Sequence, residues 1–126
     1  MLDVLFAIYS AFLLGCIGRS SKLNSKLTVT ITPESNFTPE SYNRMIVAGN
    51  VCFLSLCGRA TTTGSGWNKI AETGSNYSPS TDVYFAVMDI NGGIHHSYIN
   101  DNGRVYVDGV MSNVLLRGSV TWIKKS

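Results

Sequence analysis

Two adjacent histidines, His95 and His96, are the residues of this sequence best suited to chemistry, and they are its only histidines. Histidine side chains bind metal ions and transfer protons near neutral pH. The pair lies between two turn sequences, Asn91-Gly92-Gly93 and Asp101-Asn102-Gly103. This arrangement predicts a strand between two hairpins, and a strand sends successive side chains to opposite faces. The pair therefore does not predict a shared metal site, and we expect one histidine to pack at the edge of the core.

The cysteines are placed no better for metal binding or catalysis. Cys16 lies in a separate apolar segment, while Cys52 and Cys57 are five residues apart in a run that predicts one strand. An odd offset sends these two thiols to opposite faces, so we expect buried free thiols rather than a disulfide. The sequence also lacks a Gly-x-Ser-x-Gly nucleophile elbow and a Gly-Lys phosphate loop. We therefore expect no enzyme activity, no metal and no cofactor.

The charge of the chain argues against one large class of partner. Its 126 residues carry ten lysines and arginines against eight acidic residues, a net charge of +2. From Leu27 onward, seven basic residues meet seven acidic ones. This neutral body has no basic stripe, so we expect no nucleic-acid binding. Because only 14% of the residues are charged, the surface must rely on serine, threonine, asparagine and glycine, as in many β proteins.

Residues 1–22 differ in kind from the rest of the chain. Asp3 is the only charge in the first eighteen residues, and the uncharged run Val4–Ile17 is shorter than the roughly 20 residues that span a membrane. Three interpretations stay open: a short apolar helix that is buried or forms oligomers, a signal-like segment, and a start-site artefact. In the second, Leu13–Cys16 resembles a lipoprotein cleavage box with an acylated cysteine. Membrane contact is expected only if this segment is a signal or an anchor.

Residues 23–126 predict one all-β domain. Short runs of alternating apolar residues are separated by turn sequences about every eight to twelve residues, which is typical of an antiparallel β-sandwich or barrel-like head of about seven to eight strands. Val51–Leu56 carries apolar residues at both alternating sets of positions. We therefore expect this strand to be central and buried on both faces. We assign Trp67 and Trp122 to the core.

Three stretches of this domain resemble a known family when taken in order. They are "GWNKIAETGSNYSPSTDVYFAVM", "HSYINDNGRVYVDG" and "GSVTWIKK". Together they are similar to the C-terminal receptor-binding head of phage tail-fibre and baseplate proteins, and the likeness covers Leu23 to Ser126. Members of that family carry a long shoulder or fibre region before the head, whereas this sequence has a largely apolar segment of eighteen residues there.

The resemblance implies a homotrimeric, non-catalytic β-sandwich head of a virion tail or baseplate that attaches to host cell-surface saccharide. A second hypothesis is a secreted or lipid-anchored bacterial β-sandwich of adhesive type, located at the cell surface. The two differ in what they require of the first residues. A phage head retains Met1, whereas an anchored adhesin is cleaved or lipidated at Cys16.

A saccharide site needs an aromatic face for the ring and fixed polar groups for its hydroxyls. Five residues on the two predicted strands around the Asp101–Gly103 hairpin provide both. The candidate saccharide-binding residues are His95, Tyr98, Arg104, Tyr106 and Asp108. The alternative is that the two tyrosines pack on the sheet face and that the arginine is a solvated edge residue.

Overall fold

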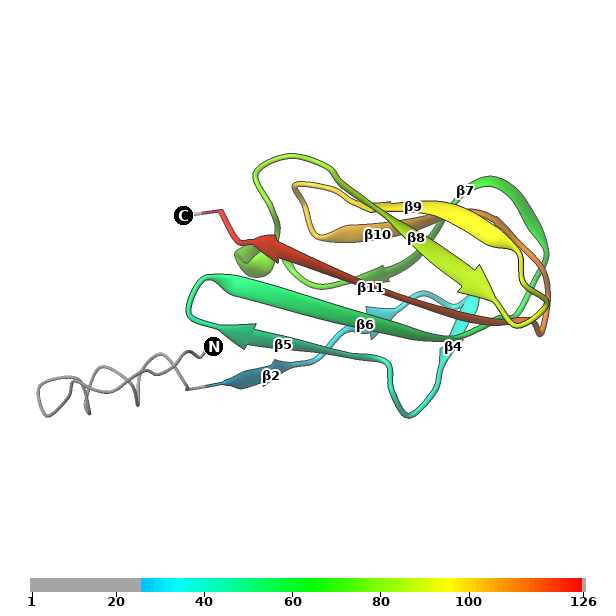
Figure 1. Ribbon diagram of the computed structural model, residues 1–126, viewed down its shortest axis with the longest axis horizontal. Coiled ribbons are helices and arrows are strands. Elements are labelled where there is room, and N and C mark those ends of the chain that lie inside the picture. Colours follow the sequence, from blue (N-terminus) through cyan, green and yellow to red (C-terminus); the bar gives the residue numbers. More distant parts are fainter. Residues whose placement is uncertain (1–25, 126) are drawn as a thin grey trace, which may run out of the picture.

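The structure, a computed structural model, describes residues 26–125 (Figure 1). The interpretations of residues 1–22 therefore concern a segment outside the described residues. Ten strands and one 3₁₀ turn, η1 (Ser75–Tyr77), make up the regular structure of the described part. The strands are β2 (Leu27–Val29), β3 (Thr32–Pro33), β4 (Phe37–Pro39), β5 (Arg44–Ala48), β6 (Val51–Ala60), β7 (Gly64–Glu72), β8 (Val83–Asp89), β9 (Ile94–Ile99), β10 (Arg104–Val110) and β11 (Leu115–Ile123). No helix within residues 26–125 is long and apolar enough to cross a membrane.

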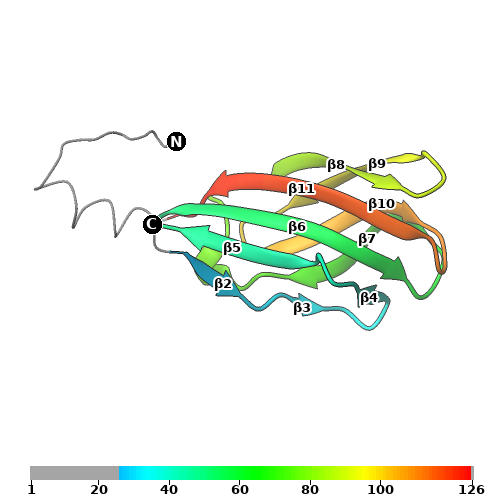
Figure 2. The ribbon, with the colours of Figure 1, turned by 60° about the horizontal axis from the view of Figure 1, so that its bottom comes forward.

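The ten strands form one antiparallel sheet that curls on itself. Their order is β2-β5-β6-β11-β8-β9-β10-β7-β3, and β4 pairs with β6 beside this path. Figures 1 and 2 show that β5, β6 and β11 form one layer, with β7 and β10 behind them. The predicted all-β antiparallel class is confirmed, as a curled half-barrel. The predicted count of seven to eight strands is wrong, because the segment between β2 and β5, which has proline at residues 33 and 39 and no alternating apolar run, contains the short strands β3 and β4.

Three hairpins form where glycine supplies a positive φ angle, and two of them are the predicted turns on either side of β9. Gly49 (φ 62°) lies between β5 and β6, Gly92 (φ 89°) between β8 and β9, and Gly103 (φ 78°) between β9 and β10. Side chains with a Cβ rarely adopt this backbone conformation, so these turns fix where each strand ends. They thereby fix the register of β8, β9 and β10, on which the arrangement of their outward side chains depends.

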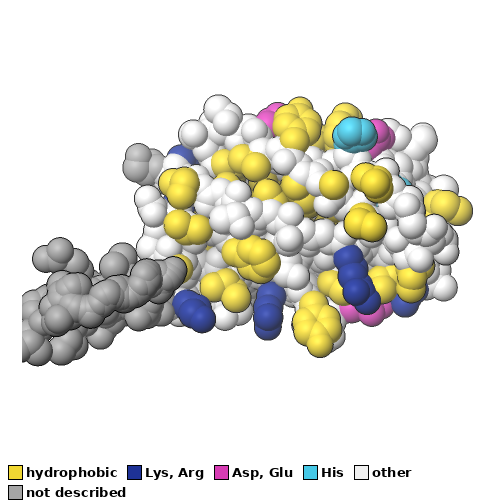
Figure 3. Space-filling model, in the orientation of Figure 1, with side chains coloured by type: hydrophobic (Ala, Val, Ile, Leu, Met, Phe, Trp, Pro, Cys, Tyr) yellow, Lys and Arg dark blue, Asp and Glu magenta, His cyan; other side chains and the backbone are white. Residues whose placement is uncertain are grey.

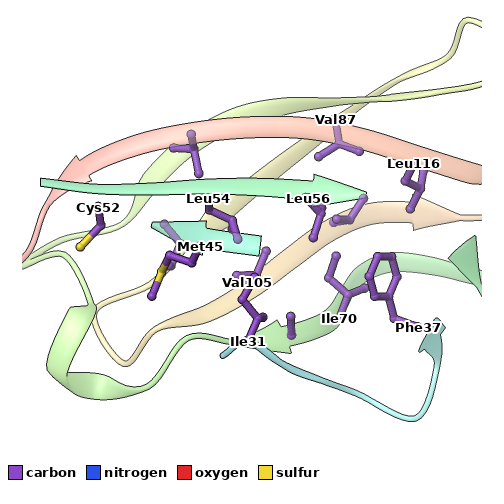
Figure 4. Close-up of a cluster of buried hydrophobic side chains, with 14 of the residues drawn as sticks. Ile31, Phe37, Met45, Cys52, Leu54, Leu56, Ile70, Val87, Val105 and Leu116 are labelled. Carbon is purple, nitrogen blue, oxygen red and sulfur yellow. The ribbon is translucent and has the colours of Figure 1, made fainter. Parts of the chain in front are cut away.

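A single core joins the two layers. Figure 4 shows Leu54 and Leu56 of β6 pointing toward Val105 of β10 and Ile70 of β7. These four side chains are at most 1% exposed. Along most of the sheet, alternate residues of a strand supply this core and the other alternate set faces outward. Val87, Ile99, Leu116 and Trp122 belong to the same cluster.

Two predictions about burial are wrong. The outer face of β6 is open, since Val51 and Phe53 are 38% and 37% exposed, although β6 lies between β5 and β11. A run of apolar residues therefore does not require a second covering layer. Trp67 is 47% exposed rather than buried. Trp122, by contrast, lies in the core as predicted, and its Nε1–H donates to the Tyr77 carbonyl at 2.7 Å.

Cys52 and Cys57 are buried free thiols on opposite faces of β6, as predicted. The Cys52 thiol donates to the Tyr77 carbonyl oxygen at an Sγ–O distance of 3.6 Å. Burial raises the pKa of this thiol, against the opposing effect of the nearby Lys124 ammonium. Because the thiolate is the nucleophilic form, Cys52 is unsuited to nucleophilic catalysis.

Candidate functional site

Four aromatic side chains form a connected row across the outer face of β7, β8, β9 and β10. The antiparallel register places Tyr84 opposite Tyr98, and Tyr98 opposite Tyr106. The ring centroids are 5.3 Å apart in the first pair and 4.9 Å apart in the second, which is stacked. Trp67 of β7 meets Tyr98 edge to face at 4.8 Å. We call these four residues the aromatic ladder.

The ladder presents its two outer members to solvent. Tyr84 is 65% exposed and Trp67 is 47% exposed, whereas Tyr98 and Tyr106 are half-buried between them. Aromatic pairs at these distances attract each other by about 0.5–1.5 kcal/mol beyond their burial, so the rings hold one another in place. The result is an exposed aromatic surface on a rigid sheet.

Burial, followed by the neighbouring Tyr106, Asp82 and Tyr84, raises the pKa of Tyr98. Its hydroxyl therefore stays protonated at physiological pH and keeps both a donor and two acceptor positions. A neutral hydroxyl at the centre of the ladder suits a ligand whose own polar groups are hydroxyls.

Charged and polar groups border the ladder on the same outer face. Arg104 and Asp108 flank Tyr106 at alternate positions of β10, and Asp108 lies opposite Trp67. Lys69 lies opposite Tyr106 in the register of β7 and β10. These groups surround the aromatic surface with one acidic and two basic side chains.

A register shift in β7 positions Lys69. Between Val105 and Tyr106 the pairing skips Ile70, so Ile70 and Ala71 are both fully buried while the residues beside them face outward. Lys69 and Glu72, three residues apart, therefore meet in an ion pair, and Glu34 joins them at an Nζ–Oε2 distance of 3.2 Å.

These ion pairs hold both partners in their charged forms. The hydrogen bond to Glu72 raises the pKa of Lys69, and the same bond lowers the pKa of Glu72. The Lys69 ammonium is thus fixed beside the ladder by two carboxylates. Its charge is balanced locally, so this border offers hydrogen bonds rather than a strong positive field.

His95 is the one predicted site residue that lies apart from the others. His95 shares a face of β9 with the buried Ser97 and Ile99, whereas His96 and Tyr98 face outward. The two histidines therefore point to opposite faces, as predicted. His95 also packs at the edge of the core, with its side chain 16% exposed. The structure brings Tyr98, Arg104, Tyr106 and Asp108 together and places His95 behind the sheet that carries them.

The imidazole of His95 lies between two hydrogen-bond acceptors. Its Nε2 is 2.8 Å from Oδ2 of Asp89, and its Nδ1 is 3.1 Å from the carbonyl oxygen of Asp108. The carbonyl oxygen only accepts and the pKa of Asp89 is lowered, so both contacts are hydrogen bonds at the same time when His95 is the protonated imidazolium. His95 thereby links the β8–β9 hairpin to β10 directly behind the site.

The pKa directions of this pair agree with the geometry. Burial lowers the pKa of His95, but its hydrogen bonds to Asp89 and to backbone carbonyls outweigh burial and raise that pKa above 6.5. The His95 hydrogen bond, followed by the Gly93 N–H, lowers the pKa of Asp89. Residues 26–125 contain no group of three or more His, Cys, Asp or Glu side chains arranged to hold a metal ion.

Tyr84 and Trp67 belong to the ladder but were not among the candidate residues predicted from the sequence. Trp67 shares its alternate set of positions with the polar Lys69, while Ile70 belongs to the other set. That alternation indicated an outward tryptophan. Tyr84 required knowledge of which strand pairs with β9, and this depends on the hairpin at Gly92 rather than on local pattern alone.

Comparisons with known proteins identify the fold. No known protein family matches the sequence, and no curated protein matches it. Among solved structures, the chain is similar to the receptor binding protein gp15 of Listeria phage PSA, with a TM-score of 0.66 and 18% sequence identity. The match covers 89% of this chain and 73% of that one. The two chains therefore share a fold, and the all-β class expected from the sequence resemblance is confirmed.

Proposed function

We propose that this chain is the receptor-binding head of a phage particle and that its aromatic ladder attaches to saccharide on the host cell surface. The observation that carries the proposal is the ladder itself, a connected row of four rings whose Trp67 and Tyr84 are exposed. Support comes from the fold shared with gp15, which is a phage receptor binding protein. The same likeness supports a location in the virion.

The ladder is chemically suited to a sugar ring. The exposed faces of Trp67 and Tyr84 offer apolar surface to the C–H side of a pyranose, on either side of the Tyr98 hydroxyl. In this proposal, Arg104 and Asp108 supply hydrogen-bond donors and acceptors at the border of the ladder. Such shallow sites gain only about 1 kcal/mol net per hydrogen bond, so one head should bind in about the millimolar to micromolar range.

Several heads on one particle would compensate for weak binding at each. We propose a homotrimer, as the sequence resemblance implies, in which three ladders bind one polymer through effective concentration rather than new contacts. The proposed role is non-catalytic. Its support is that the carboxylates of Asp89 and Glu72 are each engaged by a cation rather than poised to accept a proton.

The test is binding of purified host cell-wall polysaccharide to single-ring variants. Trp67→Ala and Tyr84→Ala remove the two most exposed rings of the ladder with the least disturbance of the core. We expect each to weaken binding by about tenfold, the effect of removing one well-placed aromatic contact. Ile123→Ala is the matched control, because Ile123 is 57% exposed and lies on β11 outside the ladder.

All variants must keep the wild-type circular dichroism spectrum for the comparison to hold. Undiminished binding in both ladder variants would place the receptor site elsewhere on the domain. Equal loss in Ile123→Ala would show that the effect is not specific to the ladder.

A further inference from the structure

A groove of about 710 Å³ crosses the outer face of β6, β11 and β8, separate from the aromatic ladder. Figure 3 shows hydrophobic side chains, in yellow, spread over this face, with basic side chains in dark blue among them. Apolar side chains, two serine hydroxyls and one arginine contribute to its lining. The residues on which the following steps depend are Tyr42, Phe53, Ser55, Met88, Arg117 and Ser119. We call this the outer groove.

The apolar side chains of the outer groove are exposed to water. Tyr42 is 68% exposed and Met88 is 53% exposed. Phe53, at 37%, faces the same side of the sheet. A hollow with apolar walls and a few polar groups is the usual form of a ligand site. The two serines, paired in register across β6 and β11, add hydroxyls to its floor.

Two arginines give the outer groove a positive charge. Arg117 lines it, and Arg44 of β5 lies opposite Ser55 in the register of β5 and β6. Both arginines are exposed, and within residues 26–125 neither takes part in an ion pair. Their positions are separated by two strand spacings and two residues, which corresponds to about 12 Å between Cα atoms.

The acidic residues around the groove do not offset this charge. Asp89 also lines it, but its carboxylate is paired with His95 at 2.8 Å. Glu40 follows β4 and is paired with Arg59 at 2.7 Å. The Glu40–Arg59 pair is neutral as a unit, and Asp89 is engaged by His95 rather than by either arginine of the groove. Arg44 and Arg117 are therefore left available to an anionic ligand.

We propose that the outer groove binds a segment of acidic glycan, a sugar or polyol chain that carries phosphate or carboxylate groups. An arginine guanidinium presents a planar fork of donors that matches the paired oxygens of either acid group. Two arginines whose Cα atoms are about 12 Å apart can bind successive acid groups of one glycan. Alternatively, both guanidinium groups can turn toward a single acid group between them. Tyr42 and Phe53 contact the C–H surfaces of the glycan. The serine hydroxyls donate hydrogen bonds to the hydroxyls of the glycan or accept hydrogen bonds from them.

This second site does not depend on the aromatic ladder and differs from it in charge. The ladder has a locally balanced border, which suits neutral sugar. The outer groove has uncompensated cations, which favour an anionic chain and make its binding sensitive to salt.

The test titrates the full chain with three probes of equal length: an oligosaccharide of uronic acids, a phosphodiester-linked sugar oligomer and a neutral oligosaccharide. Variants Arg117→Gln and Arg44→Gln each remove one exposed cation. We expect each to weaken acidic-glycan binding by about tenfold, as for loss of a charge-assisted hydrogen bond, and the double variant to bind more weakly still. Arg117→Lys should recover part of the loss, because it keeps the charge without the fork.

Lys26→Gln is the matched control, because it removes an equal charge from an exposed residue ahead of β2, outside the groove lining. It should change binding less than twofold. The acidic probes should also lose affinity as salt rises, and the neutral probe should not. Arg117→Gln should keep any neutral-saccharide binding by the ladder, so failure of this proposal is distinguishable from failure of the proposed function.

Three results would overturn the inference. The first is equal binding of the neutral and acidic probes to the outer groove. The second is unchanged acidic-glycan binding in the folded double variant. The third is a sedimentation experiment in which Arg117→Gln dissociates an oligomer, which would make the groove a contact between copies of this chain.

Discussion

Replacing His95 by glutamine should destabilise the protein most in mildly acidic solution and less as the pH rises. The imidazolium donates to Asp89 on one side and to the Asp108 carbonyl on the other. Because the pKa of His95 is raised in the folded state, its contribution is fully present below its unfolded pKa of about 6.5 and is lost as pH rises through the folded pKa. The pKa of Asp89 is lowered, so its contribution is present above its ordinary value of 3.8 and is lost in stronger acid.

The magnitude follows from the two hydrogen bonds. A hydrogen bond to a charged group contributes about 1.5–3 kcal/mol, and a neutral one about 1 kcal/mol. The His95 side chain is only 16% exposed, so solvent screens its interactions weakly. Glutamine can keep one neutral bond of the two. We therefore expect His95→Gln to lower the free energy of unfolding by about 1–3 kcal/mol at pH 5.5 and by clearly less at pH 8.5.

Urea unfolding at pH 5.5, 7 and 8.5, followed by the fluorescence of the buried Trp122, measures this difference. His96→Gln is the matched control, because His96 is exposed on the opposite face of the same strand. The difference between wild type and His95→Gln should shrink with pH, and the difference for His96→Gln should stay near zero. A pH-independent difference for His95→Gln would refute the protonated pairing with Asp89.

Further predictions concern the site, the packing and the thiol. Replacing Arg104 and Tyr106 together by alanine should abolish adhesion to host cell-wall polysaccharide in a pull-down while the circular dichroism spectrum stays unchanged. Retained adhesion would show that these two residues are not part of the binding site. Gly58→Ala should lower the free energy of unfolding in urea by about 1–3 kcal/mol, because a Cβ there would lie 2.4 Å from the Phe37 ring and 2.5 Å from the Thr38 carbonyl oxygen; unchanged stability would contradict this close approach of β4 to β6. The Cys52 thiol should react with a disulfide reagent only as fast as the protein unfolds; rapid labelling of Cys52 itself in the native chain, located by peptide mass mapping, would contradict its burial.

The fold class was predictable because its determinants are local. The glycines of the hairpins and the alternation along β8, β9 and β10 indicate strands and turns without knowledge of the rest of the chain. The short strands β3 and β4 were not predicted, because each contains a proline and pairs for only two or three residues. Their pairing depends on the positions of β6 and β7, which no local pattern encodes.

The site was predictable only in part, for a related reason. Tyr98 and Tyr106 lie on two strands joined by one hairpin, so their proximity followed from the turn. Tyr84 and Trp67 come from strands on either side, and Trp67 reaches the ladder through the register of β7 with β10. His95 was assigned to the site because it lies close in sequence. Alternation along β9 places it on the opposite face, where its charge contributes to the structure behind the ladder.

The most direct test of the central claim is a nuclear magnetic resonance titration of the full chain with host cell-wall polysaccharide fragments, following its two tryptophan indole N–H signals. Trp67 belongs to the aromatic ladder, whereas the Trp122 indole is buried and donates to the Tyr77 carbonyl. We predict that the Trp67 signal shifts progressively with fragment concentration while the Trp122 signal stays in place. Binding that leaves the Trp67 signal unmoved, or no binding at any fragment concentration up to the millimolar range, would contradict saccharide recognition by the ladder.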